Sequence, residues 1–128
     1  MFSSLRTSEA NKKHITELTN KLGLGAENTI ARIALSHSLA QSKKLNLKNI
    51  ADSKGKEYSK RILLGEHEAY YIALICQHYG LYKTDKDIPK YLKLHIDHGL
   101  ELIHRSISSN PNLDGIDFLI NEVSLGLG

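Results

Sequence analysis

The chain has 128 residues, a mass of 14.3 kDa and a formal net charge of +3. Hydrophobic residues make up 41% and charged residues 24%, which excludes a disordered tail and is typical of a single globular domain. No apolar run approaches the ~20 residues that span a bilayer, and the first residues lack the apolar core of a signal peptide. We therefore expect one cytoplasmic domain, residues 1–128, with no membrane partner. Cys76, the single cysteine, excludes an internal disulfide and an iron–sulfur cluster held by four cysteines of one chain.

Positive charge is concentrated in one segment of the chain. Residues 41–61 contain seven Lys or Arg and two Asp or Glu, a net charge of +5, whereas residues 101–128 have a net charge of −3. Cations that repel one another in the free protein suit a polyphosphate backbone, because binding releases the counterions condensed on it. Lys outnumbers Arg by 13 to 4, which favours contact with phosphates over bidentate reading of bases. The charge distribution therefore has two interpretations, a site for DNA or RNA and a solvated charged loop.

The first 42 residues are predicted to contain two helices. Residues 2–6 are either a short strand or a disordered end. Apolar residues at i, i+3 and i+7 predict an amphipathic helix over residues 9–22, with Gly23 as a left-handed cap. A second helix is predicted over residues 25–42. It is apolar around most of its circumference and needs cover on more than one side, which favours a dimer over a monomeric bundle.

The rest of the chain is predicted to be helical after an irregular segment at residues 43–61. The helix at residues 66–79 is almost wholly apolar, so we expect it to be the most buried element. Pro89 opens a long helix that stops near Ser108, and a short helix is expected over residues 116–126. The outer face of the long helix is expected to carry Lys90, Lys93, Asp97, Glu101 and Arg105. The predicted fold class is all-α, with about five helices and at most one short strand at the N-terminus.

Candidate DNA contacts come from the basic segment and, as a second group, from the N-terminal part of the chain. Lysine acts as a point charge, so these residues are expected to contact the phosphate backbone of DNA largely regardless of the base sequence. The candidates of the first group are Lys43, Lys44, Lys48, Lys54, Lys56, Lys60 and Arg61, and those of the second are Arg6, Lys12, Lys13 and Lys21.

Motifs for catalysis, nucleotide binding and metal binding are not found in the sequence. It contains no GxSxG, GxGxxG, GxxxxGK[ST] or HExxH pattern, so we expect no catalytic residue and no cofactor. His95 and His98 are spaced i, i+3 and share one side of a predicted helix, but zinc needs a third and a fourth ligand. We therefore expect no metal, and a role for His95 in packing between helices or in a hydrogen bond to a carbonyl.

Four segments of the sequence resemble the DndE family of bacterial DNA sulfur modification proteins, in order and in spacing. Together they cover about residues 5–104. The segments are LRTSEANK (5–12), NTIARIALSHSL (28–39), GEHEAYYIAL (65–74) and LHIDHGLELI (94–103).

The resemblance implies an accessory subunit of the phosphorothioation machinery, in which sulfur replaces a non-bridging phosphate oxygen of DNA. The family is described as mostly helical, oligomeric and DNA-binding, with a preference for nicked duplex, and we expect a tetramer. Sulfur transfer and ATP hydrolysis are then the work of partner proteins, a sulfurtransferase-like subunit and an ATPase. The expected assembly residues are two glycines that allow close backbone approach and four apolar residues: Gly23, Gly25, Ile30, Ile33, Leu35 and Leu39.

Three other interpretations are compatible with the sequence. A short strand followed by two helices over residues 2–42 is compatible with a ribbon-helix-helix regulator. A protein–protein scaffold of the same machinery would dock through the acidic C-terminal region and residues 66–79. A metal-dependent enzyme is the third and least favoured alternative.

Overall fold

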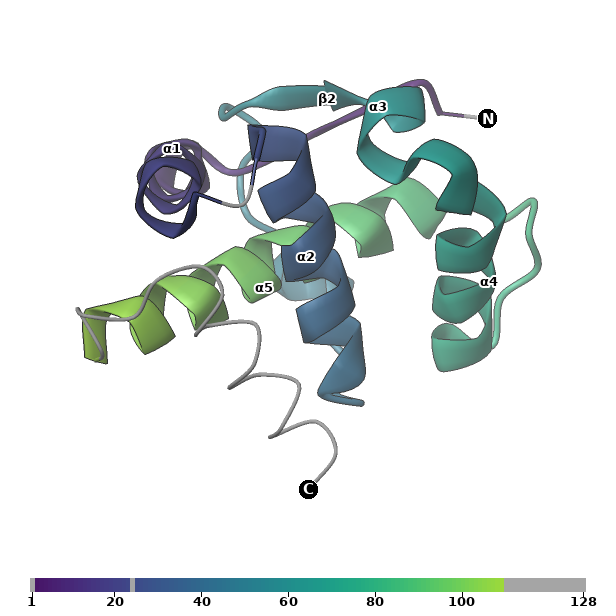
Figure 1. Ribbon diagram of the computed structural model, residues 1–128. Coiled ribbons are helices and arrows are strands. Elements are labelled where there is room, and N and C mark those ends of the chain that lie inside the picture. Colours follow the sequence, from purple (N-terminus) through teal and green to yellow (C-terminus); the bar gives the residue numbers. More distant parts are fainter. Residues whose placement is uncertain (1, 24, 110–128) are drawn as a thin grey trace.

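The computed structural model describes residues 2–23 and 25–109. Helix α2 crosses α5 at the centre of the molecule, with α1 and α4 on either side and with β2 and α3 along one end (Figure 1). The elements in chain order are β1 (Ser4–Arg6), α1 (Glu9–Leu22), α2 (Glu27–Ala40), the 3-10 helix η1 (Leu47–Asn49), β2 (Glu57–Ser59), α3 (Lys60–Leu64), the 3-10 helix η2 (Gly65–His67), α4 (Glu68–Tyr79) and α5 (Ile88–Ser109).

Helix α1 has the bounds and the caps that its sequence predicts. The Ser8 hydroxyl accepts a hydrogen bond from the Asn11 N–H at 3.2 Å, which satisfies one of the free donors of the first turn. At the other end Gly23 has φ 62°, and its N–H donates to the Thr19 carbonyl. Glycine adopts this left-handed conformation without a steric penalty, so the helix ends there.

Helix α2 is covered by other parts of the same chain. Ile30, Ala31, Ala34 and Leu35 are all 0% exposed. The contacts that bury them come from α5 above all, and from α1 and α3. The apolar circumference of this helix therefore needs no second subunit at these four positions.

The most buried element is α5, so the prediction that residues 66–79 hold that place is wrong. Only Tyr71, Ile72 and Ile75 of α4 are buried, and Tyr70 is 60% exposed. Helix α5 contains eleven buried residues. It packs against α1, α2 and α4, whereas α4 packs on one side of the molecule only.

Two charged residues of α5 also depart from expectation. Lys93 and Asp97 were expected on the outer face, but they are 6% and 5% exposed. Their side chains form an ion pair, with 2.7 Å between Lys93 Nζ and Asp97 Oδ2. A charged pair at i, i+4 is usual on solvated helix faces, and here the chain before α1 and the segment after η1 cover it.

The N-terminal strand pairs within the chain. β1 and β2 form an antiparallel pair in which Leu5 faces Tyr58. A ribbon-helix-helix protein instead pairs this strand with that of a second subunit, so that arrangement is not confirmed. Both strands have three residues, too few for an alternating pattern to show, and β2 was therefore missed in the predicted irregular segment.

The helix count differs slightly from the prediction. The described part of the chain has four helices of at least 12 residues and the five-residue α3. The short helix predicted over residues 116–126 lies outside the described residues. Among the described helices, none combines the length and the apolar character needed to cross a bilayer.

Candidate nucleic-acid interface

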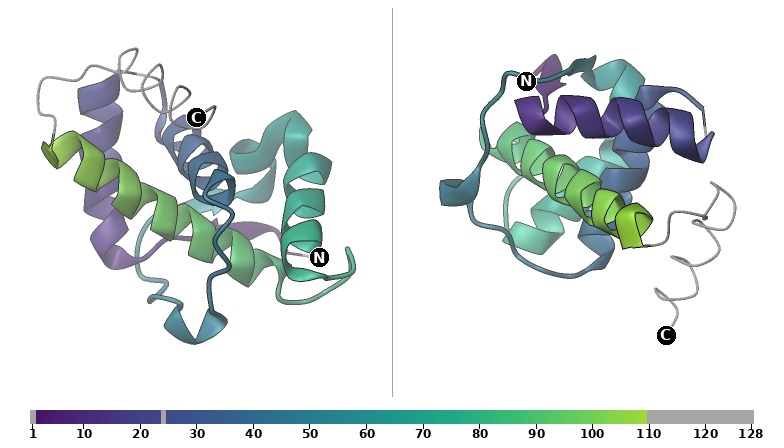
Figure 2. Two further views of the ribbon diagram at one scale, coloured as in Figure 1. Left: turned by 90° about the horizontal axis from the view of Figure 1, so that it is seen from below. Right: turned by 90° about the vertical axis from the view of Figure 1, so that its left-hand side faces the viewer.

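The segment that joins α2 to β2, residues 41–56, forms a projecting loop that we call the basic arch. Figure 2 shows in both of its views that this segment leaves the helical body, with η1 near its farthest point, and then returns to β2. Its five lysines are exposed, and it has one acidic residue. A cleft of about 190 Å³ lies between the arch and α5, with Leu45, Asn49 and His98 in its walls. The arch therefore carries a high density of positive charge that is open to solvent.

Hydrogen bonds hold the far end of the arch against α1 and α5. Asp52 Oδ1 accepts from the backbone N–H groups of Glu9 and Lys54, at 3.0 Å each. These two bonds lower the pKa of the Asp52 carboxyl, and the first of them caps α1. The Lys93 ammonium donates to the Asp52 carbonyl oxygen at 2.8 Å. The single carboxylate of the arch is thus engaged in holding its backbone in place.

Three of the eleven candidate cations are bound to carboxylates of the same chain at short distance. Exposed ion pairs are worth roughly 0–1 kcal/mol, so a phosphate can displace such a carboxylate, but the contact has to break first. Lys13 lies 3.9 Å from Glu17 and is paired more loosely. The three close pairs are Arg6 with Glu57 at 2.9 Å, Lys56 with Glu27 at 2.9 Å and Lys60 with Glu68 at 3.1 Å.

The remaining candidates are exposed and have no ion pair among the described residues. The eleven candidates as a whole do not form one patch. Lys43 and Lys44 follow the C-terminal end of α2, whereas Lys56 contacts Glu27 at the N-terminal end of the same helix. The 14 residues of α2 span about 21 Å, so the two groups of lysines lie at opposite ends of this helix. These unpaired candidates are Lys43, Lys44, Lys48, Lys54, Arg61, Lys12 and Lys21.

His95 packs between α2, α4 and α5, which confirms its predicted place between helices. The two histidines of α5 meet at a hydroxyl, because Ser38 Oγ lies 2.8 Å from His95 Nδ1 and 2.7 Å from His98 Nδ1. The Tyr79 hydroxyl is 2.6 Å from His95 Nε2. In the part of the chain that the structure describes, no group of three or more His, Cys, Asp or Glu is placed to hold a metal.

The fold is expected to lose stability between pH 6.5 and pH 4. Burial first, and then the charges of His78 and His98, lower the pKa of His95 from 6.5 to about 4. The unfolded chain binds more protons in this window, so the free energy of unfolding decreases as the pH falls through it, by up to ~3 kcal/mol. Urea denaturation near neutral pH and near pH 4.5 measures this. A His95→Gln variant should lose less on acidification, and an equal loss would contradict the assignment.

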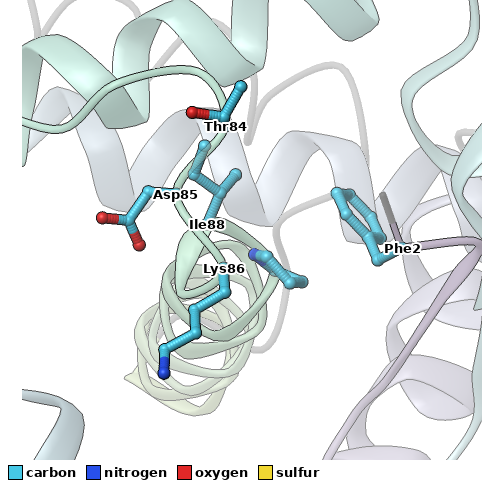
Figure 3. Close-up of a pocket in the computed structure, with 6 residues that line it drawn as sticks. Phe2, Thr84, Asp85, Lys86 and Ile88 are labelled. Carbon is cyan, nitrogen blue, oxygen red and sulfur yellow. The ribbon is translucent and has the colours of Figure 1, made fainter.

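A cleft near the N-terminus does not gather catalytic groups. It has a volume of about 430 Å³ and lies where α5 begins. In Figure 3, Phe2 lies across from Ile88, while the charged ends of Asp85 and Lys86 lie on the side away from Phe2. No polar groups converge on a common point in this cleft, so the basic arch remains the better candidate site.

The six residues predicted for assembly fall into three kinds of environment. Two of them belong to the core of the chain itself and are 0% exposed, so they offer no surface to a second subunit. Two are half-buried, and the two glycines are exposed in the turn between α1 and α2, each with a positive φ. The core residues are Ile30 and Leu35, the half-buried ones are Ile33 and Leu39, and the glycines are Gly23 and Gly25.

Sequence reasoning missed the residues that position the arch. The i, i+4 spacing of Lys93 and Asp97 is visible in the sequence, but nothing in it shows that the pair is buried. Tyr79 closes an apolar helix in the sequence and would be assigned to the core. Its hydroxyl contacts become visible only when α4, α5 and the arch are brought together.

Comparison with solved structures finds the same fold in DndE. A crystal structure of DndE from Escherichia coli B7A, described as involved in DNA phosphorothioation modification, superposes with a TM-score of 0.66 at 17% sequence identity. A double glycine-to-lysine mutant of DndE gives 0.67 at 18% identity. Each match covers 80% of this chain and 98% of the other chain.

Comparison at the level of sequence families identifies the chain, although no individual curated protein matches it. The family described as DNA sulphur modification protein DndE matches residues 4–111, which include every described helix and strand. The resemblance seen in the four sequence segments is thereby confirmed. The chain belongs to the DndE family of DNA sulphur modification proteins.

Proposed function

We propose that this protein is a non-catalytic DNA-binding subunit of the phosphorothioation machinery, which contacts the phosphates of duplex DNA through the basic arch. The observation that carries the proposal is the arch itself, five exposed lysines on a projecting segment whose single carboxylate is engaged in backbone hydrogen bonds. Membership of a DNA sulphur modification family makes DNA the fitting polyanion. The sulfur chemistry then takes place on a sulfurtransferase-like protein and an ATPase.

The lysines without ion pairs are the first contacts in this proposal. Lys43, Lys44 and Lys48 follow one another along the near half of the arch, and Lys54 lies in its far half. Arg6 and Lys60 contribute less, because each has to leave a carboxylate before it reaches a phosphate. A nick in the duplex lowers the cost of bending DNA onto a rigid charged surface, which supports a preference for nicked duplex.

Charge reversal of the near half of the arch tests the proposal. The triple variant Lys43→Glu, Lys44→Glu and Lys48→Glu is expected to weaken binding to a nicked duplex on the order of 100-fold or more at low salt. The magnitude of the salt slope should fall by about 3, since three phosphate contacts are lost. The fold should survive, because all three side chains are exposed. Fluorescence anisotropy measures the affinity and circular dichroism the fold.

A matched variant separates position from net charge. Lys83, Lys86 and Lys90 are also exposed, and their replacement with Glu changes the charge of the chain by the same amount. If the arch is the contact surface, this control should lose less than about threefold in affinity. An equal loss in the two triple variants would contradict the proposed site.

We further propose that the chain acts as a homo-oligomer, a tetramer being favoured. Ile33 and Leu39 of α2 are half-buried, and Ile62 and Tyr70 are each 60% exposed, so apolar surface remains for a second copy. An oligomer presents several copies of the lysine-rich surface to one duplex, which increases the overall affinity for DNA. Light scattering is expected to give about four times the chain mass of 14.3 kDa, and the mass of a single chain would contradict the proposal.

A further inference from the structure

The near end of the basic arch is attached to the last turn of α4 by two hydrogen bonds. The Lys43 carbonyl oxygen lies 3.0 Å from His78 Nε2, and a carbonyl can only accept, so the histidine donates. The Leu45 N–H donates to the Tyr79 hydroxyl oxygen at 3.0 Å. These bonds fix the backbone on both sides of Lys44, while the side chains of Lys43 and Lys44 stay exposed.

The Tyr79 hydroxyl is itself held by a series of hydrogen-bonding contacts that runs through His95 and Ser38 to His98. The tyrosine oxygen accepts from Leu45, and its own proton has an acceptor when it is donated to His95 Nε2, 2.6 Å away. Neutral His95 then carries its proton on Nδ1 and donates to Ser38 Oγ, and Ser38 donates to His98 Nδ1. Each donor in the chain thereby has one acceptor.

Packing makes this series of hydrogen-bonded side chains rigid. His95 is 0% exposed and Ser38 is 1% exposed, so water does not compete for their hydrogen bonds. The Tyr79 ring stacks on the ring of Tyr91, with 3.9 Å between centroids and 24° between planes. The hydroxyl that meets Leu45 therefore has a fixed position relative to α5.

We infer that Tyr79 is a positioning residue for DNA binding, which holds Lys43 and Lys44 in a preset arrangement through the Leu45 backbone. The inference rests on the proposed function. In it, the Tyr79 hydroxyl orders the near half of the arch before DNA binds. A preordered segment binds more tightly, because its conformational entropy is not lost at the moment of binding. Without the hydroxyl, ordering one or two backbone residues on binding should weaken affinity about tenfold.

The Tyr79→Phe variant of the full chain tests the inference in two ways. In the free protein, hydrogen exchange of the Leu45 amide should become faster, because its acceptor is gone. In anisotropy titrations with a nicked duplex, affinity should fall about tenfold. A matched control is Tyr58→Phe, since the Tyr58 hydroxyl is buried and has no hydrogen-bond partner among the described residues. That control should leave both measurements unchanged.

A double-mutant cycle distinguishes positioning from general destabilisation. In a Lys43→Gln/Lys44→Gln background, Tyr79→Phe should have almost no further effect on affinity, whereas in a Lys54→Gln background the tenfold loss should remain. An equal loss in both backgrounds, or an unchanged Leu45 amide, would overturn the inference. Failure of the unsubstituted protein to bind DNA would instead refute the proposed function, and the exchange result would still stand as a test of the Leu45 contact.

Discussion

Gly99→Ala is expected to destabilise the protein by about 3 kcal/mol or more, enough to unfold much of it at 37 °C. Gly99 lies where α5 crosses α2, the most extensive helix contact of the fold. A Cβ at this position would come within 2.9 Å of Ala34 Cα and closer still to the Ala34 carbonyl group. The obstructing atoms belong to the backbone of α2, so no side-chain rotation relieves the clash, and the two helices have to separate.

Thermal and urea denaturation measure this effect, and a surface position of the same helix supplies the control. Glu101 is exposed, so Glu101→Ala should change the free energy of unfolding by no more than about 0.5 kcal/mol. A Gly99→Ala variant as stable as the Glu101→Ala variant would show that α2 and α5 do not approach as closely as described.

Asp97→Ala is expected to cost about 3–5 kcal/mol, the usual range when one partner of a buried ion pair is removed. The Asp97 carboxylate accepts from the Ser8 N–H at 3.1 Å, from Asn11 Nδ2 at 2.8 Å and from Lys93 Nζ at 2.7 Å. Its loss leaves the buried Lys93 ammonium without a counter-charge. The same change loosens the start of α1 and the far end of the arch, since Lys93 also holds the Asp52 carbonyl.

A double variant shows whether the cost comes from the uncompensated charge. Lys93→Met combined with Asp97→Leu removes both charges and should be more stable than Asp97→Ala alone, because replacing a whole buried pair with apolar groups is often nearly neutral. Urea denaturation of the three proteins gives the comparison. An Asp97→Ala variant as stable as the unsubstituted protein would contradict the burial of the Lys93–Asp97 ion pair.

The helices that the sequence predicts best are those with a marked apolar period and a defined cap. Helix α1 has both, and its expected and observed bounds agree at Glu9–Leu22. The burial of α4 was overestimated because its apolar residues lie all around the helix, and composition alone does not show which face has a neighbour. Strand β2 is fixed by its pairing with Ser4–Arg6, more than 50 residues earlier, and no local pattern records that partner.

The candidate site was predictable as a set of residues and not as a geometry. The lysines of the arch stand out from charge counts alone. Their sorting into paired and unpaired groups depends on tertiary structure, as in the contact of Lys56 with Glu27. The attachment of the arch through Tyr79 and Lys93 depends on side chains that reach from α4 and α5 to the arch, and periodicity had placed Lys93 on the outer face of its helix.

The salt dependence of DNA binding by the unsubstituted protein shows whether the basic arch contacts phosphates. If the unpaired arch lysines contact phosphates, log K should fall against log salt with a slope of about −3 to −4 per chain, and nicked duplex should bind more tightly than intact duplex at every salt concentration. A slope near zero, or no binding at about 50 mM salt, would contradict the account.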